Sequence, residues 1–279
     1  VASGAAPAPA RAAAPLALLV RPEQQMERAR SDLNAALSAI ASELPGGLGA
    51  SAVEILRVRK AAERLGDLAA RLASGPRGRA DRRFDANAQA GRWRVAFSSA
   101  IARAIVAETA AEAAAAAPGD GAAVVRLADA APPPVSELSV VGAFFRAFPR
   151  MTTLASRFAL KSVEFEVVPA AAGDRYDTIL TLRGRAQPFP APALRLEHAL
   201  IASANADATM ICERIRIEPA SKDRFRQLPR PVLPTSWLPP ASRRRVTSFD
   251  VLYVDEDLMV TLSTDGDLRV ARRLTNPRR

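Results

Sequence analysis

The pattern of apolar positions divides the chain into a helical part and a longer part that alternates. Over residues 23–42, apolar side chains recur every three or four residues, which places them on one stripe of a helix. A Pro-Gly-Gly break at 45–47 ends this pattern. Ser51 and Glu54 then form a capping box that begins a second helix over 51–73. The pattern predicts a helical hairpin.

Beyond residue 84 the period of the pattern falls to two. Apolar side chains alternate with polar ones in about eight short runs, which is typical of half-buried strands. An Ala-rich stretch over 101–117 is expected to be helical, but the later runs follow one another without helices between them. This succession favours an antiparallel barrel or sandwich over an α/β sheet. The runs lie at residues 93–97, 163–167, 176–182, 194–200, 211–217, 249–253, 258–262 and 268–274.

The composition excludes several kinds of catalytic and metal-binding site. The single cysteine, Cys212, excludes an internal disulfide framework and a Cys-rich metal site, and any histidine-dependent catalysis would have to use His198. No glycine-rich phosphate loop, H-E-x-x-H or G-x-S-x-G motif is present. The acidic turn at 255–257 is expected to be solvated or paired with arginine. The sequence predicts no enzyme, no metal and no cofactor.

The charge and hydropathy of the chain argue against nucleic-acid binding and against a membrane-spanning helix. The net charge is +10, from 39 Lys plus Arg against 29 Asp plus Glu, but the arginines are mostly scattered singly among acids. Nucleic-acid binding is therefore not expected, because charge footprints carry information when they are clustered. No stretch approaches the roughly 18–20 uncharged apolar residues of a membrane span.

The expected organisation has four parts. Residues 1–22 contain two arginines and no acid among Ala and Pro, and are interpreted as a transit-peptide remnant or a plain disordered tail. Residues 23–80 form the helical hairpin and linker, 84–275 the barrel domain, and 276–279 a basic tail.

Three segments carry a resemblance to a known family. Residues 91–99, GRWRVAFSS, resemble the G-x-W-R-L-x-Y-T-T/S opening strand of the plastid lipid-associated protein (PAP/fibrillin) family. Residues 253–258, YVDEDL, resemble that family's Y-L-D-E-D-L-R-I segment, and 265–273 resemble its final G-x-L-F-V-L-x-R run. Met259 and Arg269 stand where the family usually has Arg and Phe, so the chain resembles a divergent member.

The resemblance implies a fold and a function. The fold is mainly β with α: a lipocalin-like antiparallel β-barrel preceded by an N-terminal helical hairpin. The function is non-enzymatic binding or coating of apolar isoprenoid-type lipids, such as a prenylquinone or carotenoid, at thylakoid or plastoglobule surfaces in the chloroplast. The alternative is a scaffold subunit with a filled barrel whose basic surface docks a protein complex or RNA.

Alternation along the predicted strands assigns an inner wall. A barrel of about eight strands is wide enough for one small apolar ligand, although the same side chains could fill a dry core. The residues expected to line it are Trp93, Phe97, Val163, Phe165, Leu180, Phe249, Val251 and Tyr253.

A few further residues are assigned structural roles. Gly91 opens the first strand. In lipocalin-like barrels an arginine of the last strand often covers the opening Trp, and Arg272 is the candidate here, with Arg273 the alternative if the register shifts. Glu213 lies on an otherwise apolar face, where it should pair with an inward arginine or contact a ligand hydroxyl. His198 is interpreted as a satisfied core histidine.

Two regions are candidates for membrane contact. Phe144, Phe145 and Phe148 lie next to arginines, a combination that suits a membrane interface as well as a short core helix. Trp237, in a Pro-rich loop, is the second candidate.

Overall fold

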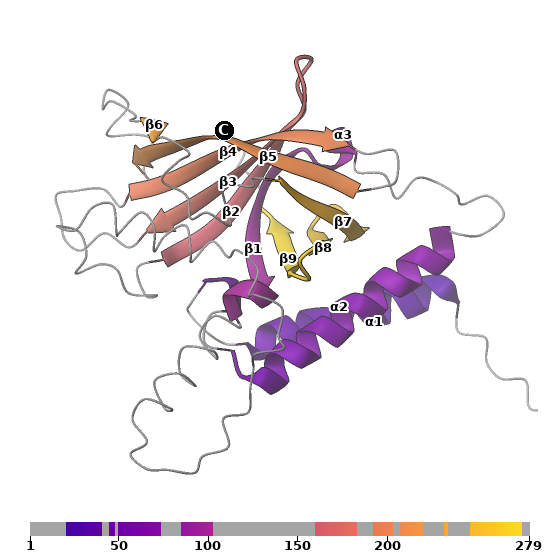
Figure 1. The fold of residues 1–279 in the computed structure, drawn as a ribbon. Helices are drawn as coiled ribbons and strands as arrows, with labels where there is room; N and C mark the ends of the chain where they lie inside the picture. Colours follow the sequence, from indigo (N-terminus) through magenta and orange to yellow (C-terminus); the bar gives the residue numbers. More distant parts are fainter. Residues whose placement is uncertain are drawn as a thin grey trace, which may run out of the picture.

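A computed structural model describes residues 21–40, 45–47, 50–73, 85–102, 160–182, 192–202, 207–219, 232–233 and 246–274. The fold has two layers, a pair of helices and a sheet that closes on itself (Figure 1). The helices are α1 (Pro22–Ala39) and α2 (Ala52–Ala73), with the 3₁₀ turn η1 (Pro45–Gly47) between them, and the short α3 (Ala86–Gln89) before the first strand.

Eight strands form a closed antiparallel ring. The order β4-β3-β2-β1-β9-β8-β7-β5 is closed by pairing of β4 with β5, and the two-residue β6 adds to β5. The strands are β1 (Gly91–Ser98), β2 (Leu160–Val168), β3 (Arg175–Leu182), β4 (Pro192–Ala202), β5 (Asp207–Pro219), β6 (Val232–Leu233), β7 (Val246–Val254), β8 (Leu258–Ser263) and β9 (Leu268–Arg273).

The predicted hairpin and antiparallel sheet are therefore confirmed. The capping box at the start of α2 is formed as expected: the Ser51 backbone N–H donates to Glu54 Oε2 at 2.7 Å, and the Glu54 N–H donates to Ser51 Oγ at 3.3 Å. None of the helices in the described part of the chain combines the length and the apolarity that a membrane crossing needs.

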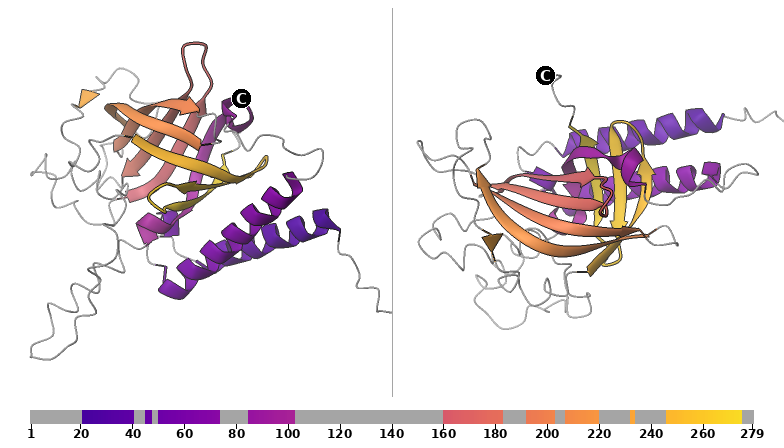
Figure 2. Two further views of the ribbon diagram at one scale, coloured as in Figure 1. Left: turned by 45° about the vertical axis from the view of Figure 1, so that its right-hand side comes forward. Right: turned by 90° about the horizontal axis from the view of Figure 1, so that it is seen from above.

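The protein has two apolar clusters, one on each side of the same strands. The inner cluster lies within the ring and includes Trp93, Phe165 and Tyr176. The second cluster lies between the helices and the outer face of β1, β7, β8 and β9, and includes Leu33 of α1 and Leu65 of α2. Figure 2 shows the helices along the yellow strands β7–β9. These strands are consequently apolar on both faces.

Four β-bulges change which side chains point inward. An extra residue stands in β1 at Ala96, in β2 at Lys161, in β5 at Glu213 and in β7 at Leu252, each opposite an uninterrupted partner strand. Because side chains alternate with a period of two, one extra residue moves every following side chain to the other face.

The outer face of β1–β5 carries an ordered network of ion pairs. Asp177 is fully buried there. Its carboxylate forms ion pairs with Arg175 Nη2 at 2.7 Å and with Arg195 Nη1 at 2.9 Å. Glu164 is held in the same way by Arg92 at 2.6 Å and Arg94 at 3.1 Å. Long arginine stems cover the carboxylates, so this face is closed by charge pairing instead of by a second apolar layer.

Candidate functional site

One end of the ring is sealed by an arginine over a tryptophan. Trp93, the third residue of β1, is fully buried, and its Nε1–H donates to the Gln89 carbonyl at 2.9 Å. The Arg273 guanidinium lies 4.2 Å from the Trp93 ring centroid and donates to the carbonyls of Ala90 (2.6 Å) and Ala88 (3.2 Å) at the end of α3. A cation–π contact and two charge-assisted hydrogen bonds thus join β1, β9 and α3.

Gly91 has a backbone conformation that favours glycine. Its φ of +119° is one that L side chains rarely adopt. The structural role expected for Gly91 therefore has a backbone cause.

Stacked aromatic rings extend from the sealed end into the ring. Trp93 and Phe165 face each other across β1 and β2 with centroids 6.3 Å apart, and Phe165 stacks on Tyr176 at 4.8 Å. Tyr176 contacts Phe249 from β7 at 5.7 Å. These four rings form an aromatic column that fixes four strands relative to one another.

His198 lies beside this column. Its Nδ1 is 2.8 Å from the Tyr176 carbonyl, so the imidazole donates from that nitrogen, and it meets the Tyr176 ring edge-on at 6.3 Å. Burial lowers the pKa of His198 to about 4, and the positive charge of Arg269 acts in the same direction. The ring is therefore neutral at pH 7, which agrees with the expected core histidine.

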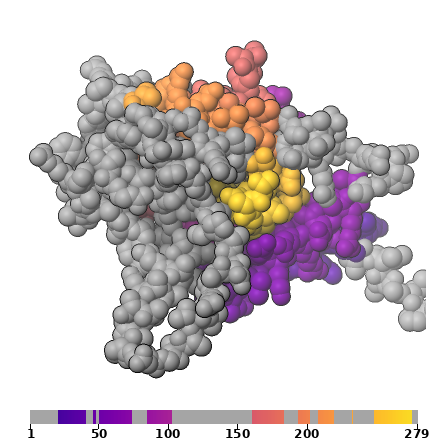
Figure 3. All heavy atoms as spheres, viewed as in Figure 1, coloured from indigo at the N-terminus to yellow at the C-terminus, as the bar shows by residue number. Residues whose placement is uncertain are grey.

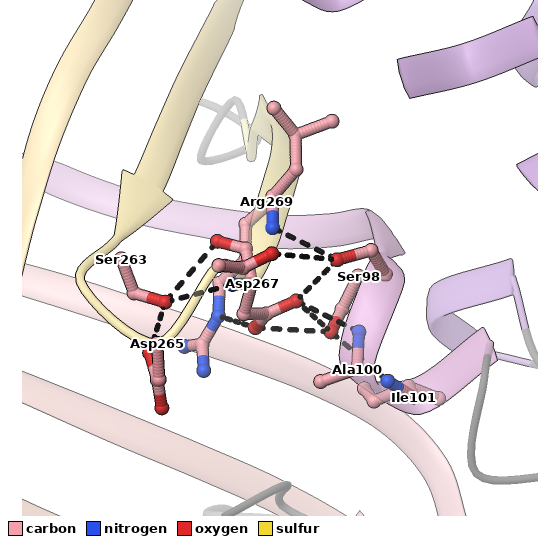
Figure 4. Close-up of polar contacts among 10 residues, drawn as sticks. Ser98, Ala100, Ile101, Ser263, Asp265, Asp267 and Arg269 are labelled. Carbon is pink, nitrogen blue, oxygen red and sulfur yellow. Dashed lines mark hydrogen bonds and ion pairs between the residues drawn. The ribbon is translucent and has the colours of Figure 1, made fainter. Parts of the chain in front are cut away.

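Figure 4 shows a second polar centre, where the end of β1 meets the β8–β9 hairpin. The buried Asp267 carboxylate accepts hydrogen bonds from Ser98 Oγ (3.0 Å), Ser99 Oγ (3.1 Å) and the Ala100 N–H (2.8 Å), and pairs with Arg269 Nε at 2.7 Å. All of these partners stabilise the charged carboxylate. The arrangement ties two distant segments together and positions the helical turn at residues 99–102.

Sequence reasoning missed the role of Asp267. A signal was present in the adjacent hydroxyls of Ser98 and Ser99, but their partner is about 170 residues away along the chain. Only the pairing of β1 with β9 brings the two segments together.

Two of the eight expected lining residues point the other way. Phe97 and Tyr253 belong to the cluster beneath the helices, and a Cβ on Gly47 of η1 would lie 2.8 Å from the Phe97 ring. Their predicted inward orientation was wrong because each follows a bulge, at Ala96 and Leu252. Tyr253 instead donates to Asp255 Oδ2 at 2.7 Å, and burial together with this carboxylate raises its pKa to about 12.

The other six lie in or against the inner cluster: Trp93, Val163, Phe165, Leu180, Phe249 and Val251. Their role in ligand binding stays a prediction.

The structure corrects two other assignments. Arg272 shares the face of Leu268 and Val270, but this face packs against the helices and not into the ring. Arg272 is exposed and donates to Asn34 Oδ1 of α1 at 3.2 Å, whereas Arg273, the alternative, covers the Trp93 ring. Glu213 is not buried on an apolar face, because it is itself the extra residue of the β5 bulge and points to solvent. Arg30 pairs with Asp255 at 3.3 Å, so the acidic turn is arginine-paired as expected.

Some predicted residues cannot be placed. Phe144, Phe145, Phe148 and Trp237 lie outside the described residues, as do residues 1–20 of the interpreted leader, residues 103–117 of the expected Ala-rich helix and the basic tail over 276–279. In the described ranges, His, Cys, Asp and Glu side chains form no group of three or more that could hold a metal ion.

The inner cluster within the ring is apolar, and His198 beside it is neutral at pH 7. The Asp267 carboxylate already accepts three hydrogen bonds and pairs with Arg269. Comparisons of this chain with protein-family models, with curated proteins and with solved structures found no match.

Proposed function

We propose that this chain is a non-enzymatic carrier or coat protein for apolar, isoprenoid-type lipids, with a lipocalin-like barrel of the plastid lipid-associated kind. The observation that supports this best is the closed antiparallel ring with an apolar inner wall and one sealed end. Sites for small apolar ligands have this composition, with a few polar groups that orient the ligand. His198 is the polar group available beside the aromatic column.

The proposed entrance is the end of the ring opposite Trp93. The end of β3 pairs with the start of β2 at Leu182 and Leu160, and the start of β4 pairs with the end of β5 at Pro192 and Pro219. β1 ends and β2 begins at this same end of the ring, at Ser98 and Leu160. We propose that this end faces the thylakoid or plastoglobule surface in a chloroplast.

A filled scaffold is the second candidate, and the aromatic column favours it. Four aromatic rings already occupy the space near the sealed end. If they and their neighbours fill the ring completely, the protein would act through its outer surface, on a protein complex or RNA.

Lipid exchange into the purified full-length chain separates the two candidates. The protein is incubated with a thylakoid lipid extract and re-isolated, and its lipids are identified by mass spectrometry. A carrier retains a prenylquinone or carotenoid at about one per chain, whereas a filled scaffold enriches none.

A matched pair of variants locates the bound lipid. Val251→Trp places a bulky ring on the half-buried inner wall, and Ile201→Trp places the same ring on the outside, where Ile201 is 53% exposed. The proposal requires that Val251→Trp lowers lipid occupancy and that Ile201→Trp leaves it unchanged, with both variants still folded by circular dichroism. Equal occupancy in the two variants would place the lipid outside the ring.

A further inference from the structure

The two helices form a polar groove on their side away from the ring. It has a volume of about 590 Å³ and runs between α1 and α2. Figure 3 shows the hairpin that bears it as a continuous surface beside the yellow strands. Its charged lining consists of Arg28 from α1 and Lys60, Glu63, Arg64, Asp67 and Arg71 from α2.

The groove has an excess of uncompensated positive charge. Arg64 pairs with Asp32 at 3.2 Å, and Glu63 pairs with Arg59 at 2.8 Å, so these charges cancel locally. The cations Arg28, Lys60 and Arg71 have no hydrogen-bond or ion-pair partner among the described residues, and Asp67 is the one acid left in the lining to offset them. The groove therefore attracts anions.

Large apolar side chains are exposed on the same face of α2. At 100° per residue, Val53, Arg57, Lys60, Arg64 and Arg71 fall within an arc of about 60°, and Asp67, the acid that offsets one of these cations, lies about 20° outside it. Val53 is 67% exposed and Leu56, beside this arc, is 51% exposed. The opposite face of α2 packs on β7, where Gly66 meets the Leu252 side chain. The helix therefore has one face fixed to the ring and one outward face that is both apolar and basic.

We propose that this outward face of α2, together with the groove, docks the protein on an anionic lipid bilayer. Val53 and Leu56 enter the boundary between headgroups and acyl chains, while the cations meet the anionic headgroups. The acidic residues Glu23 and Glu27 of α1 lie about 160° around that helix from the groove residue Gln25, so they do not oppose this approach.

The combination of charge and exposed apolar side chains favours a bilayer over a nucleic acid or an acidic protein. Nucleic-acid binding relies on cations and stacking, and does not need exposed aliphatic side chains at the contact. The choice of a bilayer over an acidic protein rests on the proposed lipid function. The docking face is nevertheless separate from the ring interior, so the docking proposal and the carrier proposal can be refuted independently.

The test is co-sedimentation of the full-length protein with vesicles. Vesicles of phosphatidylcholine with phosphatidylglycerol should bind it, those of phosphatidylcholine alone should not, and binding should weaken as salt is raised. Each cation near an anionic surface contributes about fivefold to the partition coefficient, so Lys60→Gln/Arg71→Gln should bind roughly 25-fold more weakly. Val53→Gln/Leu56→Gln should also weaken binding.

A charge-matched control removes two exposed cations elsewhere. Lys161→Gln/Arg214→Gln changes strands β2 and β5 and leaves α2 intact. It should bind as the unaltered chain does. Equal loss in both double variants would show attraction by net charge alone, and no loss in Lys60→Gln/Arg71→Gln would exclude this face; either result overturns the proposal.

Lipid occupancy of the ring, measured in the same samples, separates this proposal from the carrier function. Loss of vesicle binding with an unchanged ring lipid supports both. Vesicle binding by a chain that holds no lipid supports the docking face alone. Binding of the α2 face to RNA or to an acidic protein, but not to anionic vesicles, contradicts the docking proposal and leaves the ring lipid unaffected.

Discussion

Replacing Arg273 with methionine should destabilise the ring far more than the same change at its neighbour Arg272. Arg273 donates hydrogen bonds to the carbonyls of Ala88 and Ala90 and lies 4.2 Å from the Trp93 ring centroid. Methionine keeps much of the apolar stem but removes all three contacts. At about 1 kcal/mol for each bond of this half-buried group and about 0.5–1 kcal/mol for the cation–π contact, the loss is about 2–3 kcal/mol.

Arg272→Met is the control, since Arg272 is exposed and makes one bond of 3.2 Å, to Asn34. Its loss should cost less than about 1 kcal/mol. Urea denaturation followed by circular dichroism gives the free energy of unfolding of both variants. Trp93 emission, read in a Trp237→Phe background, should shift to longer wavelength in Arg273→Met alone. A larger loss of stability in Arg272→Met would refute the assigned register of β9.

Three other changes test separate parts of the structure. Asp267→Ala removes the buried acceptor of Ser98 Oγ, Ser99 Oγ and the Ala100 N–H and the carboxylate that pairs with Arg269, and should cost about 3–5 kcal/mol in urea denaturation, whereas Asp265→Ala, at an exposed position, should cost less than about 1 kcal/mol. Gly91→Ala should lower stability by about 1–3 kcal/mol through its positive φ, and an unchanged melting temperature would contradict this. His198 has a folded pKa of about 4 against about 6.5 when unfolded, so the unfolded chain binds more protons between these values. The contribution of neutral His198 to the free energy of unfolding should be fully present above pH 6.5 and should fall by up to about 3 kcal/mol as the pH drops to 4. The His198→Gln variant should lack this part of the pH dependence.

The helices and the class of the sheet could be predicted because their signals are local. The capping box at Ser51 and Glu54 and the three- to four-residue periodicity that follows need no distant partner. The alternation of Val163, Phe165 and Val167 indicates an inward face correctly, because the other face of β2 is charged.

The predicted side-chain directions were wrong where strands are apolar on both faces. In β1 and β7 the alternation continues through the bulges at Ala96 and Leu252, since the ring interior and the helices both take apolar side chains. Phe97 therefore fits either pattern, and only the packing of η1 on the sheet settles its direction. A bulge depends on the partner strand, which a single strand's sequence does not specify.

The ion-pair network on the outer face also could not be predicted from the pattern of residues along single strands. Asp177 alternates with apolar residues in the way that solvent-exposed side chains do, yet it is fully buried. Its burial depends on Arg175 and Arg195, which lie next to it only after β3 and β4 have paired.

The most direct test of the central claim is photo-crosslinking with a prenylquinone analogue that carries a diazirine on its tail. The full-length chain is labelled, digested and mapped by peptide mass spectrometry. A carrier ring should be labelled on inner-wall residues such as Val163, Leu180 and Val251. Labelling confined to the outward face of α2, or to exposed positions such as Ile201, would contradict a ligand held inside the ring.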